Sequence, residues 1–247
     1  MRYLGSKNRI SKHLVPIIQS YITDECKGYI EPFVGGANII DKIKCHNKIG
    51  YDINPYLIAL LNHIKTTTED FPREITREHY YEVKNNKENF DDWYIGLIGF
   101  CGSFSAKFWG GYARNGNIAK NKNSYYNEAI INLINQRANL LDIKFECNNY
   151  KDLDGLSGYV IYCDSPYKGT TGYKIKFNHE EYYEWLRKMS IQNIVLISEY
   201  EMPDDFECIW EKDILCRVSK QNKLKSDDSN RRTEKLFIHK NGIKSLS

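Results

Sequence analysis

Two apolar segments, each followed by a helix-like pattern, restrict the fold of this chain more than any other feature. Residues 27–34 (KGYIEPFV) read as a buried strand, and after two glycines a helix-like pattern follows at 37–44. Residues 47–54 (NKIGYDIN) read as a second strand, followed by a helix-like segment at 55–64. This β-α-β-α order predicts an α/β fold with a parallel sheet and right-handed crossovers.

The same pattern resumes in the second half of the chain. The predicted elements are, in order, a strand that opens 159–167, a helix at 179–189, and strands at 193–200, 206–218 and 234–240. The polar stretch 219–232 separates the last two strands, and a loop of that length is usually functional or disordered. Its cationic residues make it a second candidate for phosphate contacts: Lys220, Lys223, Lys225, Arg231 and Arg232.

Between roughly residues 65 and 145 the pattern becomes helical. We therefore predict a catalytic core formed by 1–64 and 145–247, with 65–144 as a smaller inserted domain. Within the insert, residues 102–124 combine aromatic rings with lysine and arginine and contain no acidic residue. Cations for phosphates and flat rings for stacking are what nucleic-acid binding needs. The alternative is a solvated loop.

Composition narrows the class of protein. Of its 247 residues 41% are hydrophobic, the net charge is only +3, and the mean hydropathy is −0.59. No apolar run approaches the roughly 18–20 residues that a membrane-spanning helix needs, and the first residues lack the apolar region of a signal peptide. The seven cysteines form no CxxC pair and the six histidines lie apart. We expect a cytoplasmic protein with reduced thiols, without a metal site and without a membrane partner.

Two glycines and an acidic residue indicate a cofactor site. Gly35 and Gly36 follow the first predicted strand, where the backbone can approach a ligand closely near a helix N-terminus. Asp52 lies at the end of the second strand, where a carboxylate can accept hydrogen bonds from ribose hydroxyls. The pair favours a nucleoside-cofactor site. The alternatives are a plain strand-to-helix turn and, for Asp52, a helix N-cap.

Asp164, Ser165, Pro166 and Tyr167 follow a later strand, at the edge where ligands of open α/β sheets collect. A carboxylate and a neighbouring main-chain carbonyl can accept both hydrogens of an exocyclic amino group, and Tyr167 can stack on the ring that carries it. Two such acceptors favour a pyramidal nitrogen, whose lone pair can attack a methyl group in line. A base must leave its stack to enter such a site. The alternative is an ordinary turn containing Asp and Pro.

With these motifs in order, the chain resembles the DNA adenine-N6 methyltransferase (Dam) family along nearly its whole length. The resemblance rests on RYLGSK (2–7), EPFVGGAN (31–38), YDIN (51–54) and DSPY (164–167). It implies a class I, Rossmann-like methyltransferase core that uses S-adenosylmethionine and carries a mostly helical target-recognition insert. The family usually reads a short palindrome such as GATC.

The resemblance also implies roles for individual residues. The implied catalytic residues are Asp164, Ser165, Pro166 and Tyr167. The implied cofactor-binding residues are Tyr3, Lys7, Phe33, Gly35, Gly36, Ala37, Asp52, Asn149, Asp164 and Tyr173, the last of which closes over the site.

The chain departs from the family pattern in places. The usual motif is Asp-Pro-Pro-Tyr, and Ser165 replaces its first proline; serine keeps the main-chain carbonyl, and Pro166 still restrains it. We expect a working enzyme, slower to the extent that ring rigidity matters there. The family often has Asp where this chain has Asn148 and Asn149, either of whose amide oxygens could accept from the cofactor adenine.

The insert resembles the family only loosely, so its recognition sequence cannot be carried over. Arg114 is the best candidate for a base-edge contact, because arginine bidentate to guanine is the commonest specific contact. Asn115 follows it at an expected hairpin tip, since Asn-Gly favours that turn. Lys107, Lys120 and Lys122 are expected to contact phosphates of double-stranded DNA.

The sequence thus predicts a DNA adenine-N6 methyltransferase that acts as a monomer or weak dimer, of bacterial or phage type. Its role could be phage self-protection, restriction-modification or replication marking. The alternatives are a methyltransferase for cytosine N4 or for adenine in RNA, and a catalytically weakened DNA-binding protein.

Overall fold

The computed structural model describes residues 1–113, 125–167, 177–215 and 231–241. The chain divides into two compact units. The first comprises Met1–Ser20 and Ile30–Asp152, and the second comprises Tyr21–Tyr29 and Leu153–Ser247. This division does not test the predicted boundaries of core and insert, which stay a prediction.

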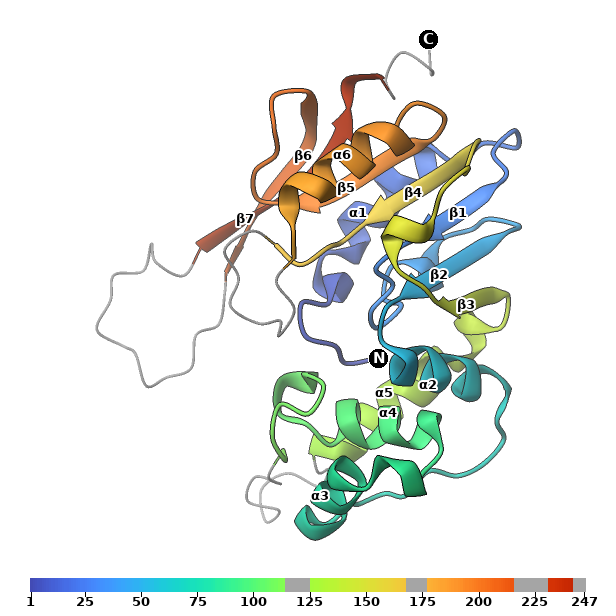
Figure 1. The fold of residues 1–247 in the computed structure, drawn as a ribbon, viewed down its shortest axis with the longest axis vertical. Helices are drawn as coiled ribbons and strands as arrows, with labels where there is room; N and C mark the ends of the chain where they lie inside the picture. The colour runs from blue at the N-terminus through green and yellow to red at the C-terminus, as the bar shows by residue number, and fades with distance from the viewer. Residues whose placement is uncertain (114–124, 168–176, 216–230, 242–247) are drawn as a thin grey trace. The chain divides into compact units, whose positions relative to one another are not determined.

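Seven strands of the described residues form one sheet, in the order β3-β2-β1-β4-β5-β7-β6 (Figure 1). Their bounds are β1 Gly28–Glu31, β2 Lys48–Asp52, β3 Ile143–Cys147, β4 Tyr159–Cys163, β5 Ile194–Glu199, β6 Phe206–Leu215 and β7 Arg231–His239. Strands β2 and β3 pair in parallel, as do β4 and β5, whereas β7 is antiparallel to both of its neighbours. The predicted α/β class is confirmed.

The helices of the first unit are α1 Ser11–Ser20, α2 Pro55–Thr66, α3 Arg77–Asn85, α4 Asp92–Cys101 and α5 Tyr125–Leu140. Helix α2 begins where Asn54 accepts hydrogen bonds from the backbone of Tyr56 and Leu57, with Pro55 in its first turn. It packs against α4, α5 and β3. Figure 1 shows α4 and α5 beside α2, with α3 against α4, and the helical character of these segments agrees with their sequence pattern.

The predicted helix at 37–44 is wrong. This stretch contains only a short 3-10 turn, Ile40–Lys42. Gly35 and Ala37 both have positive φ, +48° and +54°, so the chain turns twice before a helix could start. The apolar residues with helical spacing are still buried, because the compact turn packs them inward: Ile39, Ile40 and Ile43.

The second unit holds α6, His179–Met189, as predicted. Asn178 caps it by accepting from the backbone of Glu181, and acidic residues begin the helix while basic residues end it, which complements its dipole. Its buried residues recur at helical spacing: Tyr182, Trp185, Leu186 and Met189. Strands β6 and β7 form the two predicted strands around the polar stretch, although Arg231 and Arg232 belong to β7 rather than to a loop. In the described parts of the chain, no helix is both long and apolar enough to cross a bilayer.

Candidate active site

The glycine turn after β1 is closed by the amino-terminal segment. The Val34 amide donates to the carbonyl of Tyr51 in β2 at 2.7 Å, which fixes where the turn starts. A Cβ atom on Gly35 would lie 2.9 Å from the Tyr3 ring, and one on Gly36 would lie 2.8 Å from the Tyr3 Cβ. Only glycine fits at these two positions, so the structure brings together the turn and the RYLGSK motif that the sequence singled out.

Asp52 is tied to this turn. One carboxylate oxygen accepts from the Gly35 amide at 3.2 Å and the other from the Asn54 amide at 3.0 Å. Asn54, not Asp52, caps α2, so the N-cap alternative for Asp52 is wrong. Burial of the carboxyl group raises the pKa of Asp52 from 3.8 to about 6, against the opposing effect of its backbone hydrogen bonds. A partly buried carboxylate beside a tight glycine turn suits a ligand that donates hydroxyl hydrogens.

The other predicted cofactor residues of this unit lie on nearby elements. The Phe33 ring packs against Tyr150, with ring centroids 5.3 Å apart. The amide oxygen of Asn149 accepts from the backbone of Lys151 at 3.1 Å, which starts a short 3-10 turn at Tyr150. Lys7 is buried in the short turn before α1, and the backbone of Ala37 forms the second bend of the glycine turn.

The DSPY motif follows β4 in the second unit. Ser165 is 3% exposed, and Asp164 and Pro166 are partly buried. The Tyr167 hydroxyl donates to Glu234 on β7 at 2.9 Å, and its ring meets the Tyr200 ring edge-on at 4.6 Å. Burial raises the pKa of Tyr167 well above its usual value, helped by the charges of Asp164 and Glu234, so this phenol stays protonated.

Sequence reasoning missed Glu234 and Tyr200, which hold Tyr167, and Gln136 on α5, which contacts the glycine turn. The position of Tyr200 directly after a predicted strand was the one available signal. The meeting of the DSPY motif with the glycine turn and Asp52 stays a prediction.

Most of the predicted DNA contacts and one cofactor contact lie outside the described residues: Arg114, Asn115, Lys120, Lys122, Lys220, Lys223, Lys225 and Tyr173. Lys107 is described, and it is exposed. It follows Phe104, which is 67% exposed, and two residues with positive φ, Ser105 and Ala106. An aromatic ring and a cation thus share one exposed, sharply turned segment of the insert.

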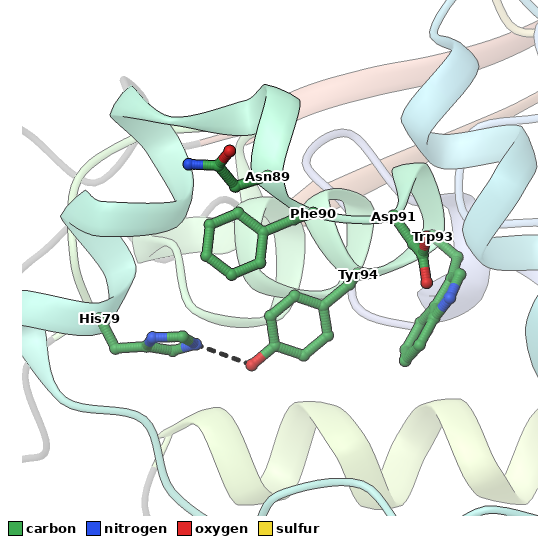
Figure 2. A pocket seen from close by; sticks show the side chains of 6 residues that line it. All are labelled: His79, Asn89, Phe90, Asp91, Trp93 and Tyr94. Carbon is green, nitrogen blue, oxygen red and sulfur yellow. Dashed lines mark hydrogen bonds between the residues drawn. The ribbon is translucent and has the colours of Figure 1, made fainter.

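The insert also carries a shallow hollow of about 440 Å³ (Figure 2). Its lining residues are His79, Asn89, Phe90, Asp91, Trp93 and Tyr94. The His79 ring pairs with the Tyr94 hydroxyl at 2.7 Å. No predicted site residue lines this hollow. Among the described residues, no group of three or more His, Cys, Asp or Glu side chains could hold a metal ion.

Residues 3–192 match the family model of the D12 class N6 adenine-specific DNA methyltransferases. The chain belongs to this family. The match to the D12 family model confirms the resemblance from which the roles of the motifs were assigned. The observed sheet agrees with the predicted class I methyltransferase fold.

Relatives of this D12 member include the Type II methyltransferase M.FokI of Planomicrobium okeanokoites, 25% identical over 196 residues, which cover 70% of this chain and 29% of the relative. The DNA adenine methylase of Vibrio cholerae is 27% identical over 173 residues, 62% of this chain and 61% of the relative. The chain therefore spans less than two thirds of either relative. Two solved structures of the rRNA methyltransferase aviRa from Streptomyces viridochromogenes also align with this chain, each at 10% sequence identity. The first has a TM-score of 0.43 and covers 97% of this chain and 88% of its own. The second has a TM-score of 0.44 and covers 100% of this chain and 90% of its own. A likeness at that level says nothing about substrate.

Proposed function

We propose that this chain transfers a methyl group from S-adenosylmethionine to N6 of an adenine flipped out of double-stranded DNA. The observation that carries the proposal is the D12 family match over residues 3–192, which includes the DSPY motif at the end of β4. Of the two relatives, one is named as a Type II methyltransferase and the other as a DNA adenine methylase.

The residues of the first unit suit the cofactor. The Gly35–Gly36 turn leaves no room for a side chain, so its backbone can lie against a ligand. Asp52 offers carboxylate oxygens for ribose hydroxyls, and the Phe33 ring offers an apolar face for adenine. When bound, S-adenosylmethionine supplies a methyl group on a positively charged sulfur, which makes the methyl carbon electrophilic.

The DSPY residues act on the target base. The Asp164 carboxylate and the main-chain carbonyl of Ser165 accept the two N6 hydrogens, which localises the nitrogen lone pair for in-line attack. N6 forms a bond to the methyl carbon as the carbon–sulfur bond breaks, and the extra proton on N6 passes to solvent. Tyr167 keeps its hydroxyl proton and its hydrogen bond to Glu234, so it serves as a fixed, neutral ring for stacking.

The insert reads the target. We assign Lys107 to a phosphate, with Arg114 and Asn115 at base edges and Lys120 and Lys122 at further phosphates. A short palindrome such as GATC, a monomeric or weakly dimeric state, and action inside a bacterial or phage-infected cell remain parts of the prediction.

The direct test is incubation of the protein with methyl-labelled S-adenosylmethionine and either duplex DNA or RNA, followed by digestion to nucleosides. We expect label in N6-methyldeoxyadenosine from DNA. Label in N4-methyldeoxycytidine or in methylated adenosine from RNA would replace the adenine-in-DNA proposal with one of its rivals.

A further inference from the structure

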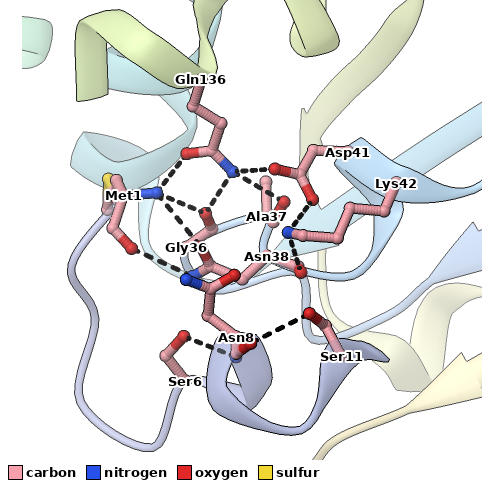
Figure 3. Close-up of polar contacts among 10 residues, drawn as sticks. All are labelled: Met1, Ser6, Asn8, Ser11, Gly36, Ala37, Asn38, Asp41, Lys42 and Gln136. Atoms are coloured by element: carbon pink, nitrogen blue, oxygen red, sulfur yellow. Dashed lines mark hydrogen bonds and ion pairs between the residues drawn. The ribbon is translucent and has the colours of Figure 1, made fainter. Parts of the chain in front are cut away.

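A single buried amide joins helix α5 to the glycine turn (Figure 3). Gln136 is 6% exposed, and its Nε2 donates to the carbonyl oxygens of Gly36 at 3.2 Å and Ala37 at 2.9 Å. The same nitrogen donates to the Asp41 carboxylate at 2.8 Å. Two amide hydrogens are therefore shared among three acceptors. The Oε1 atom on the other side accepts from the amino group of Met1.

The turn needs such support. Ala37 has a φ of +54°, a left-handed conformation that costs a residue with a side chain about 1 kcal/mol. Conformations of this kind persist only where the surroundings hold them in place. The Gly35 amide is held by Asp52 on one side of the turn, and the Gly36 and Ala37 carbonyls are held by Gln136 on the other.

Gln136 comes from the part of the chain predicted to read DNA. Helix α5 starts at Tyr125, directly after the sequence stretch 114–124, and Gln136 lies three turns along it. Arg2, next to the Tyr3 that closes the turn, stacks over the Tyr125 ring at 4.8 Å and pairs with Glu128. Side chains along one helix thus contact both the amino-terminal segment and the turn.

We propose that Gln136 is a positioning residue for the cofactor: it holds the Gly36 and Ala37 carbonyls so that the turn keeps the shape that binds S-adenosylmethionine. This inference rests on the proposed function. The side-chain hydrogen bonds of Gln136 go to the turn, to Asp41 and to Met1, so its effect on the reaction passes through the turn. Losing these bonds is expected to weaken cofactor binding about tenfold, the worth of roughly one net hydrogen bond.

Exchanging the amide and carboxylate groups between positions 136 and 41 separates this positioning role from a general contribution to the stability of the fold. Gln136→Glu keeps the shape but removes both donor hydrogens, and it sets a carboxylate beside Asp41. Adding Asp41→Asn restores a donor–acceptor pair between positions 136 and 41 without restoring the bonds to the carbonyls. Gln136→Met, which has similar length and no charge, is a second variant that avoids buried like charges. Asn135→Asp makes the same amide-to-carboxylate change at the exposed neighbouring position and is the matched control.

The measurements are the Kd for S-adenosylmethionine by calorimetry, the unfolding midpoint, and the split between KM and kcat. We expect the double variant and Gln136→Met to remain folded, with Kd and KM for the cofactor raised about tenfold and kcat within about twofold of wild type. The control should match wild type. Cofactor affinity within about twofold of wild type in folded Gln136 variants would overturn this inference alone, whereas a wild-type protein that binds no S-adenosylmethionine would overturn the proposed function with it.

Discussion

The hydroxyl of Tyr167 donates a hydrogen bond to Glu234 at 2.9 Å, so the last residue of the DSPY motif is anchored to β7. The Tyr167 ring also meets Tyr200, which follows β5. The motif is therefore held by residues that lie far from it in the sequence, one on β7 and one directly after β5. A ring fixed in this way has lost its rotational freedom before a base arrives, which lowers the entropic cost of stacking.

Removal of the Glu234 contact should slow the reaction. We expect Glu234→Ala and Tyr167→Phe each to lower kcat about tenfold with the Kd for S-adenosylmethionine unchanged, because the ring remains but is no longer fixed. Glu234→Gln keeps an acceptor and serves as the control. Steady-state kinetics of the double variant completes the cycle: if the two losses simply multiply, the residues do not act through their mutual hydrogen bond.

Cofactor affinity should depend on pH through Asp52. Its pKa of about 6 lies above the usual 3.8, so the carboxylate that we propose accepts ribose hydroxyls is lost as pH falls below 6. We expect the Kd for S-adenosylmethionine to be constant above pH 7 and to rise by up to about tenfold per pH unit well below 6. The Cys147 thiol, whose raised pKa reflects burial and the nearby Asp52, titrates above this range.

Asp52→Asn is the matched variant for this prediction. A raised pKa means that the ionised form of Asp52 destabilises the folded state. The contribution of Asp52 to the free energy of unfolding therefore becomes unfavourable as pH rises from about 3.8 to 6. The variant should therefore be more stable at pH 8, with a free energy of unfolding higher by on the order of 1 kcal/mol, yet bind the cofactor weakly and without pH dependence. Binding of the variant that still weakened below pH 6 would assign the titration to another group.

Ser165→Pro should raise the rate of methyl transfer. Serine keeps the main-chain carbonyl that we propose accepts from the target amine, but it lacks the ring that would stiffen this part of the backbone. Single-turnover measurements isolate the chemical step, and Ser165→Ala, which lacks both hydroxyl and ring, is the control. An unchanged rate in the proline variant would show that rigidity at this position does not matter.

Binding to DNA should be steeply salt-dependent, and Lys107 should contribute to the slope. If its exposed ammonium group meets a phosphate, Lys107→Ala lowers the slope of log K against log salt by about 1 and weakens binding to all sequences alike. Lys12→Ala, at an exposed lysine on α1, is the control. Titrations by fluorescence anisotropy at several salt concentrations provide the slopes, and equal slopes for the two variants would contradict the assignment.

The helices and most strands could be predicted because their periodicity is local. Residues 55–64 and 179–189 bury one helical face, as their spacing indicated. Strand β3 was not predicted, although its buried Ile143 and Phe145 alternate with more exposed residues. This alternation is short, and it follows directly on the stronger helical pattern of the preceding segment. The stretch at 37–44 has helical spacing but no helix, because backbone bends at Gly35 and Ala37 override the pattern.

The residues of the candidate site also fall into those that a local sequence pattern could predict and those that it could not. Gly35, Asp52 and the DSPY residues carried local signals, namely turn chemistry and the ends of buried strands. Glu234 and Gln136 did not, because Glu234 lies 67 residues from Tyr167 and Gln136 lies 99 residues from Ala37. Their roles follow only from tertiary contacts that a single sequence does not display.

The central claim is tested most directly by methylation-sensitive sequencing of DNA from a methylation-deficient host that expresses this chain, beside its Asp164→Ala variant. We predict N6-methyladenine in one sequence context, present with the wild-type chain and absent with the variant at equal protein levels. Unmodified DNA from cells containing a folded wild-type protein that binds S-adenosylmethionine, or methylation that persists in the variant, would contradict the account.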